Sequence, residues 1–251
     1  MPESAGSKTA ANVIIANDTA TIAAMQADSQ LRELRTKLLA AFVKYRYTYN
    51  FTWYGRPIIQ LPEDIVAIQE IILSTRPDLI IETGVAHGGS IALSASMLEL
   101  LGSGKVVGID VDLRRQNRQA LESHPLHKRI HLIEGSSIEE RVIREVRGHA
   151  AKSERVMVML DSNHTYEHVA KELQLYSPLV SKGCYLVVFD TVIEDLPEGL
   201  FPDRPWGKGN NPKTAVLEFL KSTARFEIDQ GIQSRLFSTV APDGYLRCTK
   251  D

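Results

Sequence analysis

The sequence contains few cysteines, no excess of basic residues and no long apolar run. Its two cysteines, Cys184 and Cys248, are far apart in apolar stretches, so a disulfide framework like those of small secreted domains is not expected. Lysine and arginine number 29 against 31 acidic residues, and the formal net charge of −2 argues against binding of nucleic acid. No stretch approaches the roughly 20 apolar residues that span a bilayer, and the opening residues do not resemble a signal peptide. These absences predict a soluble, cytoplasmic protein without a membrane span.

The length of 251 residues is enough for one full-sized core. We expect residues 1–60 to form an N-terminal helical extension with a lid function, and residues 61–251 to form the main domain. Apolar residues recur at helical spacing from Gln30 to Tyr47 and predict an amphipathic helix there. The aromatic stretch that follows offers Trp53, Tyr54 and Arg56 to close over a substrate, with plain packing as the alternative.

After Arg76, apolar runs alternate with helical patterns in the order that builds a parallel sheet covered on both faces. The predicted strands are residues 79–82, 105–110, 130–134, 156–160 and 184–189. The predicted helices are residues 90–101, 113–123, 138–149, 166–180 and 214–222. Two last runs, 225–229 and 244–249, predict a closing antiparallel hairpin. The sequence therefore predicts an α/β fold with a mostly parallel, seven-stranded sheet.

A glycine-rich loop, IIETGVAHGGSIALSA, follows the first of these strands. Ligands of open α/β sheets bind beyond the carboxyl ends of the strands, so this loop is the expected cofactor site. Gly84 and Gly88 allow a tight turn into a helix whose free N–H groups face the ligand. Their spacing differs from the G-x-G-x-x-G dinucleotide pattern and favours the E/D-x-G-x-x-x-G pattern of S-adenosylmethionine binders, in which Glu82 faces the ammonium group of the ligand.

Other residues of this edge complete the predicted cofactor site. The second strand ends in GIDVD, which places Asp110 to accept hydrogen bonds from ribose hydroxyls. His87 and Ser90, in and after the glycine loop, are further candidates for cofactor contacts. The alternatives are an ordinary tight turn for the loop, a helix-capping role for Asp110 and a solvated side chain for His87.

Two carboxylates follow the fourth and fifth strands at the same edge of the sheet. Asp161 and Asp190 end the runs VMVMLD and LVVFD, and oxygen ligands brought together in this way suit Mg²⁺ or Ca²⁺. Thr191 offers a hydroxyl as a further ligand. A metal bound there would orient a diol substrate and lower the pKa of its hydroxyl, and His164 is placed to accept the proton. Capping or surface positions are the alternatives for these residues.

These stretches together resemble the family named after cephalosporin hydroxylase, which also contains rhamnosyl O-methyltransferases. The matching segments, which span about residues 50–195, are WYGRPIIQLPED, RPDLIIETGVAHGGSIALSA, GIDVD, LDSNHTYEHV and LVVFDT. The resemblance implies a Rossmann-like class I methyltransferase fold, S-adenosylmethionine as cofactor, an Mg²⁺ site and homo-oligomers. It further implies that Asp161 is a metal ligand that also borders the cofactor, and that His164 is the catalytic base.

The related sugar O-methyltransferases have a Glu-Asp pair after the fifth strand, whereas this chain has Phe189-Asp190. Asp190 therefore corresponds to a ligand and the glutamate has no counterpart. The third ligand is left open among Thr191, Glu194 and water. Nothing in the sequence supports the hydroxylation after which the family is named.

The sequence thus predicts an S-adenosylmethionine-dependent, Mg²⁺-dependent O-methyltransferase. Its expected substrate is a small hydroxylated acceptor, either a rhamnosyl-type sugar or a natural-product intermediate. Two other functions stay open. His164, Glu167 and His168 satisfy the H-x-x-E-H pattern of a zinc metallopeptidase, and the same fold also occurs in proteins that bind S-adenosylmethionine without catalysis. A nucleotide-binding dehydrogenase is disfavoured by the glycine spacing.

Overall fold

A computed structural model describes residues 19–251, so residues 1–18 of the predicted N-terminal extension lie outside it. The helices are α1 (Thr19–Ala27), α2 (Ser29–Lys44), α3 (Pro62–Thr75), α4 (Gly89–Leu101), α5 (Arg115–Glu122), α6 (Glu140–Ala150), α7 (Tyr166–Tyr176), α8 (Pro212–Ser222) and α9 (Gln230–Gln233). Short 3₁₀ helices cover η1 (Tyr47–Asn50), η2 (His127–Arg129), η3 (Ser177–Leu179) and η4 (Thr191–Asp195). None of the helices between residues 19 and 251 is long and apolar enough to cross a membrane.

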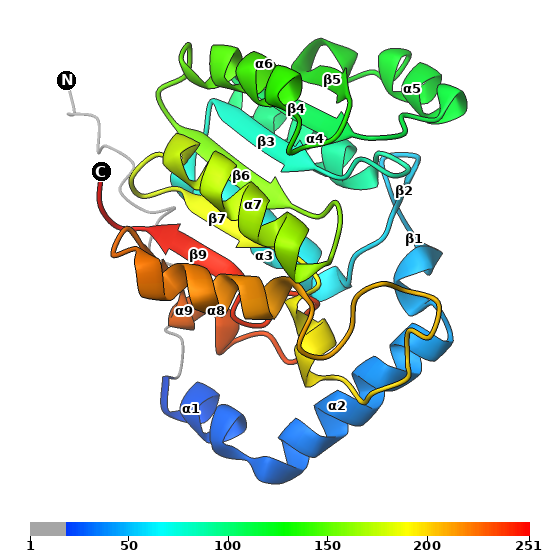
Figure 1. Cartoon of the computed structure of the whole chain (residues 1–251), viewed down its shortest axis with the longest axis vertical. Helices are drawn as coiled ribbons and strands as arrows, with labels where there is room; N and C mark the ends of the chain where they lie inside the picture. Colours follow the sequence, from blue (N-terminus) through cyan, green and yellow to red (C-terminus); the bar gives the residue numbers. More distant parts are fainter. Residues whose placement is uncertain (1–18) are drawn as a thin grey trace, which may run out of the picture.

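The strands form one large sheet and one small hairpin (Figure 1). They are β1 (Phe51–Trp53), β2 (Arg56–Ile58), β3 (Leu79–Thr83), β4 (Lys105–Asp110), β5 (Ile130–Glu134), β6 (Val156–Leu160), β7 (Tyr185–Val188), β8 (Phe226–Ile228) and β9 (Tyr245–Cys248). The seven-stranded sheet has the order β5-β4-β3-β6-β7-β9-β8, and β9 runs in the opposite direction to the other six strands. This confirms the predicted α/β fold with a mostly parallel sheet and an antiparallel C-terminal hairpin.

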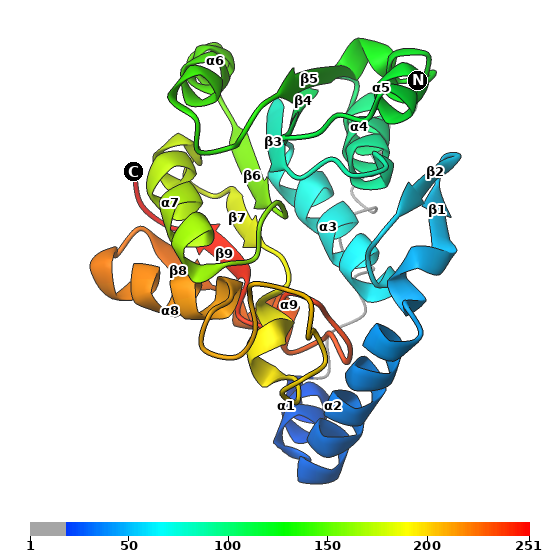
Figure 2. The same cartoon turned by 45° about the vertical axis from the view of Figure 1, so that its right-hand side comes forward.

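Helices cover both faces of this sheet, as Figure 2 shows, with α6, α7 and α8 on one face and α3, α4 and α5 on the other. Two clusters of buried apolar side chains correspond to these two faces. All five residues of β3 and of β6 are buried, because these strands lie in the middle of the sheet between both layers. The near-continuous hydrophobicity of the strands therefore has a direct structural cause.

The strand register brings the predicted site residues to one edge. Thr83 pairs with Leu160, and Leu160 pairs with Val188, so β3, β6 and β7 end side by side. The chain leaves these strands at Gly84, Asp161 and Phe189-Asp190. The functional residues are therefore neighbours although about 100 positions separate the first from the last.

Several elements outside the large sheet differ from the prediction in bounds or were not predicted. The helix expected at residues 30–47 is α2 and ends at Lys44, whereas α1, α9 and the β1–β2 hairpin were not predicted. Leu39 of α2 belongs to a small apolar cluster with Val192 and Leu196, and Phe42 and Phe201 pack against that cluster. Helix α2 thus lies against the segment that follows β7.

Candidate active site

Gly84 turns the chain out of β3 in a conformation that only glycine adopts easily. Its φ is +90°, and a Cβ placed there would lie 2.0 Å from the carbonyl oxygen of Asp161. The Gly84 amide donates to the Ile109 carbonyl at 2.8 Å. The absence of a side chain therefore allows the ends of β3, β4 and β6 to converge.

Asp110 fixes the glycine loop from the end of β4. Its Oδ2 accepts hydrogen bonds from the amides of Val85 (2.8 Å) and Ala86 (3.0 Å), and its Oδ1 accepts one from the amide of Asp112 (3.0 Å). A carboxylate offers about four acceptor positions, so one position stays available for a ribose hydroxyl. Asp110 has a loop-bracing role that sequence reasoning did not predict, and its ribose contact stays a prediction.

Two residues outside the predicted set hold the same loop. Arg56 donates through Nε (2.9 Å) and Nη2 (2.6 Å) to the carbonyl of His87, and its Nη2 also donates to Asn117 Oδ1 at 3.0 Å. Asn117, which is buried on α5, in turn donates to the carbonyl of Ala86 at 2.8 Å. Arg56 therefore braces the cofactor loop in this structure, where the sequence had suggested closure over a substrate.

Glu82 has an unsatisfied buried oxygen at the floor of the site. Its Oε1 accepts a hydrogen bond from Ser90, whereas its Oε2 is buried and has no hydrogen-bond partner among residues 19–251. Burial raises the pKa of Glu82 to about 8, and the bond from Ser90 opposes that rise. A buried carboxylate in need of a donor is suited to an ammonium group, so this part of the site fits the amino-acid end of S-adenosylmethionine.

Glu82 should make the ligand-free protein less stable as the pH rises. The unfolded chain releases the Glu82 proton near its ordinary pKa of 4.5, whereas the folded chain keeps it until about 8, so the folded state holds more protons between these values. Unfolding experiments from pH 4.5 to pH 8 should show falling stability. In Glu82→Gln the free energy of unfolding should fall less over this pH range. The difference from the parent should be a few kcal/mol, which is the order of magnitude that the pKa shift of Glu82 implies.

Glu218→Gln, on the exposed face of α8, is the matched control and should leave the pH dependence as it is in the parent. If the free energy of unfolding depends on pH equally in Glu82→Gln and in the parent, the pH dependence does not come from Glu82.

Asp161, His164 and Asp190 form a cluster beside Glu82. One ligand atom from each lies within 4.8 Å of the others, and His164 Nε2 is 3.0 Å from Asp190 Oδ2. Burial raises the pKa of Asp161 well above its ordinary range, and the nearby charges of Asp190 and Glu82 raise it further. The two carboxylates repel each other without a cation, so the donor set fits a hard divalent ion such as Mg²⁺.

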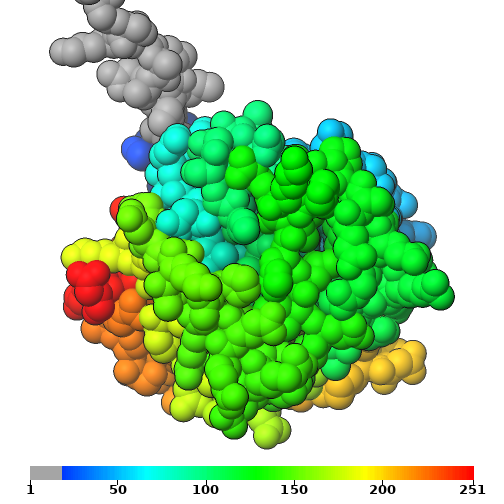
Figure 3. All heavy atoms as spheres, turned by 90° about the horizontal axis from the view of Figure 1, so that it is seen from above, coloured from blue at the N-terminus to red at the C-terminus, as the bar shows by residue number. Residues whose placement is uncertain are grey.

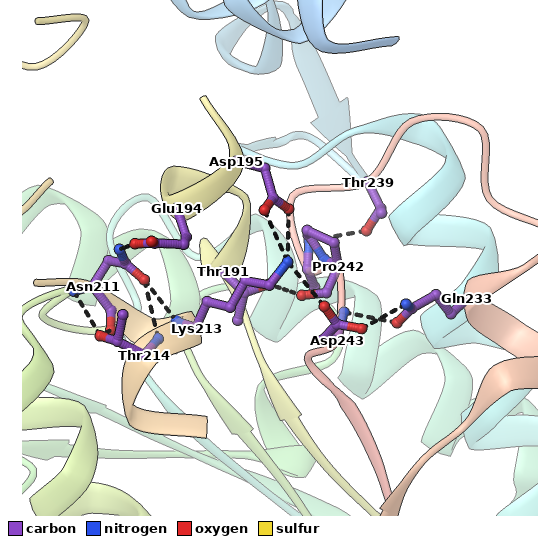
Figure 4. Close-up of polar contacts among 11 residues, drawn as sticks. Thr191, Glu194, Asp195, Asn211, Lys213, Thr214, Gln233, Thr239, Pro242 and Asp243 are labelled. Atoms are coloured by element: carbon purple, nitrogen blue, oxygen red, sulfur yellow. Dashed lines mark hydrogen bonds and ion pairs between the residues drawn. The ribbon is translucent and has the colours of Figure 1, made fainter. Parts of the chain in front are cut away.

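The structure does not support the other two candidates for a third ligand. Thr191 is fully buried, and its hydroxyl donates to the carbonyl of Pro242 at 2.6 Å, as Figure 4 shows. Glu194 Oε2 accepts hydrogen bonds from the amide of Gly209 (2.7 Å) and the side chain of Asn211 (2.5 Å). The side chain that lies beside the two aspartates is His164, the predicted base, so water is left of the three candidates for the third ligand.

The H-x-x-E-H pattern does not form a zinc site in this structure. His168 Nε2 lies 3.0 Å from Ser137 Oγ and 3.6 Å from Glu172 Oε1, whereas His164 pairs with Asp190. Glu167 is exposed at the start of α7. The two histidines thus belong to different groups of side chains, and the metallopeptidase alternative has no structural support.

Lys213 ties the segment after β7 to the C-terminal loop (Figure 4). Its Nζ lies 2.8 Å from Asp195 Oδ2 and 2.9 Å from Asp243 Oδ2, and its side chain is 14% exposed. Burial opposes the charge of Lys213, but the hydrogen bonds to both aspartates outweigh it and raise the lysine pKa. This network keeps η4, which begins directly after Asp190, against the body of the domain.

Lys213→Met should destabilise the protein because it leaves Asp195 and Asp243 without their cation. Both aspartates keep some contact with water, so we expect a loss of about 1–2 kcal/mol in the free energy of unfolding, less than for a fully buried pair. Urea denaturation measures this loss. Lys221→Met is the control, because solvent screens the exposed Lys221–Glu218 pair and its loss should change the stability much less. Equal losses in the two variants would contradict the role of the Lys213 network.

The sheet order, the glycine turn and the acidic cluster at the carboxyl edge define a class I methyltransferase. The model of the Rhamnosyl O-methyltransferase/CmcI family matches residues 45–249. The chain therefore belongs to this family and is an S-adenosylmethionine-dependent O-methyltransferase.

Curated relatives agree with this assignment. Rhamnosyl O-methyltransferase from Mycobacterium tuberculosis is 29% identical over 201 residues, which cover 78% of this chain and 77% of the relative. The enzyme of the same name from Mycobacterium leprae is 29% identical over 200 residues, or 78% of this chain and 82% of the relative. A solved structure of CmcI with Mg and SAM has a TM-score of 0.58 and 18% identity, covering 80% of this chain and 78% of that one. Because only 18% of the residues are identical, this solved structure supports the fold alone.

Proposed function

We propose that this enzyme transfers the methyl group of S-adenosylmethionine to a hydroxyl of a sugar-type acceptor in an Mg²⁺-dependent reaction. The observation that carries the proposal is the contact between the two halves of the site. The backbone of Asp161 lies against Gly84 of the cofactor loop, while its side chain joins His164 and Asp190. A methyl donor held by the loop and a hydroxyl held by the cluster would thus be neighbours. The names of the relatives support a rhamnosyl-type acceptor.

The residues of the site divide into two groups with different tasks. Glu82, Gly84, Ser90 and Asp110 would hold the cofactor, with His87 contributing at least its backbone to the shape of the loop. Asp161 and Asp190 would hold Mg²⁺, which, when bound, neutralises the carboxylates and lowers the pKa of an acceptor hydroxyl. The complex of CmcI with Mg and SAM supports this pairing of ion and cofactor.

His164 is suited to remove the proton of the acceptor. Asp190 Oδ2, 3.0 Å from Nε2, holds a proton on that nitrogen and leaves Nδ1 as the acceptor of the hydroxyl proton. Asp190 then stabilises the imidazolium that forms. The acceptor oxygen attacks the methyl carbon as the carbon–sulfur bond breaks, and the electron pair stays on sulfur. The products are the methyl ether and S-adenosylhomocysteine, and alignment of the reacting atoms supplies much of the rate.

The segment after β7 offers an apolar wall beside this base. The Trp206 ring lies edge-on to His164, with 5.4 Å between the ring centroids, and the Phe201 ring is tilted against Trp206 with 4.7 Å between their centroids. A cavity of about 50 Å³ opens among Phe201, Trp206 and their neighbours. Aromatic side chains suit the apolar C–H faces of a sugar ring, and α2 packs behind Phe201. The described part of the predicted N-terminal extension, residues 19–60, is accordingly proposed to support and cover the acceptor, and residues 61–251 to form the catalytic domain.

Trp206→Leu should weaken binding of the acceptor and leave binding of the cofactor unchanged. We expect the KM for a methyl rhamnoside to rise by about tenfold, which corresponds to the roughly 1–1.5 kcal/mol of a lost aromatic contact. The Kd of S-adenosylhomocysteine, measured by calorimetry, should stay unchanged. Trp206→Phe keeps a ring and is the matched control, with an intermediate KM. A loss of cofactor binding in Trp206→Leu would contradict the placement of Trp206 on the acceptor side.

The proposed function is tested by calorimetry followed by a transfer assay. The chain is titrated with S-adenosylmethionine and S-adenosylhomocysteine, with and without Mg²⁺, and labelled methyl transfer to a panel of rhamnosides is measured with Mg²⁺ or with a chelator. We expect micromolar cofactor binding and transfer that the chelator abolishes. Transfer that survives chelation would refute the Mg²⁺ requirement, and cofactor binding without transfer to any rhamnoside would refute the rhamnosyl-type acceptor.

The proposal also includes a cytoplasmic location and a homo-oligomeric state. The two cysteines are free and buried, which suits a reducing compartment. Fractionation of cells and light scattering of the purified chain test these two points.

A further inference from the structure

A second group of metal-ligand side chains lies away from the active site, between β5 and α6. His131 is the second residue of β5, and Glu145 and His149 are one turn apart on α6. One ligand atom from each of the three lies within 4.8 Å of the others. His131 precedes the carboxyl end of β5 by three residues, or roughly 10 Å along the strand. Helix α6 lies at the upper end of Figure 1, and Figure 3 looks onto that end, where green segments form most of the surface.

The donor atoms of His131 and Glu145 have the separation expected in a tetrahedral metal site, and a donor atom of His149 lies within 4.8 Å of both. His131 Nε2 lies 3.2 Å from Glu145 Oε1, and the rings of His131 and His149 have centroids 4.6 Å apart. Zinc binds imidazole nitrogen and carboxylate oxygen at about 2.0–2.2 Å, which sets neighbouring ligands roughly 3.4 Å apart in a tetrahedron. The 3.2 Å between His131 Nε2 and Glu145 Oε1, which form a hydrogen bond in the absence of an ion, is close to this spacing. The side chains of His131 and Glu145 are 43% and 41% exposed, so an ion can enter and keep water as a fourth ligand.

The chemistry of the donors differs from that of the active-site cluster. Two imidazoles and one carboxylate suit Zn²⁺, whereas the two carboxylates of Asp161 and Asp190 suit Mg²⁺. Lys105 and Lys152 lie near enough to His149 for their charges to oppose a cation there, so the affinity will be moderate.

We propose that His131, Glu145 and His149 form a Zn²⁺ site that joins the edge strand β5 to the last turn of α6. This site is separate from the methyltransferase centre and does not rest on the proposed function. Because the folded chain assembles the three ligands, zinc should also raise the melting temperature.

The test is a zinc titration of the untagged full chain with Mg²⁺ in large excess, which occupies the carboxylate cluster. We expect one Zn²⁺ per chain by calorimetry and a rise in melting temperature. Co²⁺ should give the visible absorption of a tetrahedral site. Loss of a residue that only supports a metal ligand lowers metal affinity roughly 10–100-fold. Loss of a ligand itself should cost at least as much. We therefore expect zinc binding to weaken at least about tenfold in each of three variants, His149→Gln, His131→Gln and Glu145→Gln.

His127→Ala removes an exposed histidine from outside the group and is the matched control, with binding as in the parent. Methyl transfer, which does not involve these residues, should stay unchanged in His149→Gln and shows that the variant is folded. Absence of zinc binding in the parent would overturn the proposal. Undiminished binding in His131→Gln and His149→Gln would also overturn it, because zinc would then occupy other ligands.

Discussion

Gly84→Ala is expected to abolish cofactor binding and to destabilise the fold. The added Cβ would lie 2.0 Å from the carbonyl oxygen and 2.6 Å from the carbonyl carbon of Asp161, and neither is a flexible side-chain atom that can rotate away. Backbone must therefore move, which separates the ends of β3 and β6 and shifts Asp161 relative to Glu82. Overpacking of this kind costs about 1–3 kcal/mol, and the left-handed conformation costs alanine roughly 1–2 kcal/mol more.

Gly183→Ala separates these two costs. Gly183 has a φ of +81°, close to that of Gly84, but a Cβ there would meet nothing within 4 Å. The control Gly183→Ala should lose only the free energy of unfolding that the left-handed backbone costs alanine. It should bind S-adenosylhomocysteine as the parent does. Calorimetry and urea unfolding of the two variants measure the difference. If Gly84→Ala and Gly183→Ala lose the same stability and bind S-adenosylhomocysteine equally well, the contact between Gly84 and Asp161 does not shape the site.

The central strands could be predicted closely because their residues are buried on both faces. β4, β5 and β6 have the bounds that the apolar runs predicted, and β3 is longer by one residue. The same logic brought Gly84, Asp161 and Asp190 to one edge, because parallel strands that share a register end together. Prediction therefore succeeded where burial alone determines the pattern of residues.

Contacts between distant segments could not be predicted in this way. Arg56 and Asn117 brace the glycine loop through backbone carbonyls, which any sequence supplies. The β1–β2 hairpin is only three residues per strand, too short to show a periodic pattern. Asn211 caps α8 through its side chain and so starts that helix at Pro212, two residues before the predicted position.

Thr191 illustrates the limit for the site itself. Its position next to Asp190 suggested a ligand, but the backbone of Asp190 is left-handed, with a φ of +56°, and turns the chain into η4. The Thr191 hydroxyl then lies against Pro242, more than 50 positions later in the chain. Adjacency in sequence does not imply a shared direction of side chains where the backbone turns.

Asp161→Asn should remove methyl transfer and at the same time stabilise the metal-free protein. The carboxylate is a proposed Mg²⁺ ligand, so its loss should reduce kcat by at least about 10²-fold. Reductions of this size follow when an enzyme loses a group that stabilises charge in the transition state. Without metal, however, burial and the neighbouring Asp190 and Glu82 disfavour the charge on Asp161 and raise its pKa. Asparagine carries no charge, so the melting temperature of the metal-free variant should exceed that of the parent near neutral pH.

His164→Gln provides the contrast that separates the ligand from the base. It should lower kcat by roughly 10²–10⁴-fold and leave the Mg²⁺ affinity close to that of the parent. Mg²⁺ should raise the melting temperature of the parent and of His164→Gln, but not that of Asp161→Asn. If His164→Gln loses Mg²⁺ binding as Asp161→Asn does, His164 is a third ligand and the proton has another acceptor. If Asp161→Asn still responds to Mg²⁺, the ion binds elsewhere and the cluster is not the metal site.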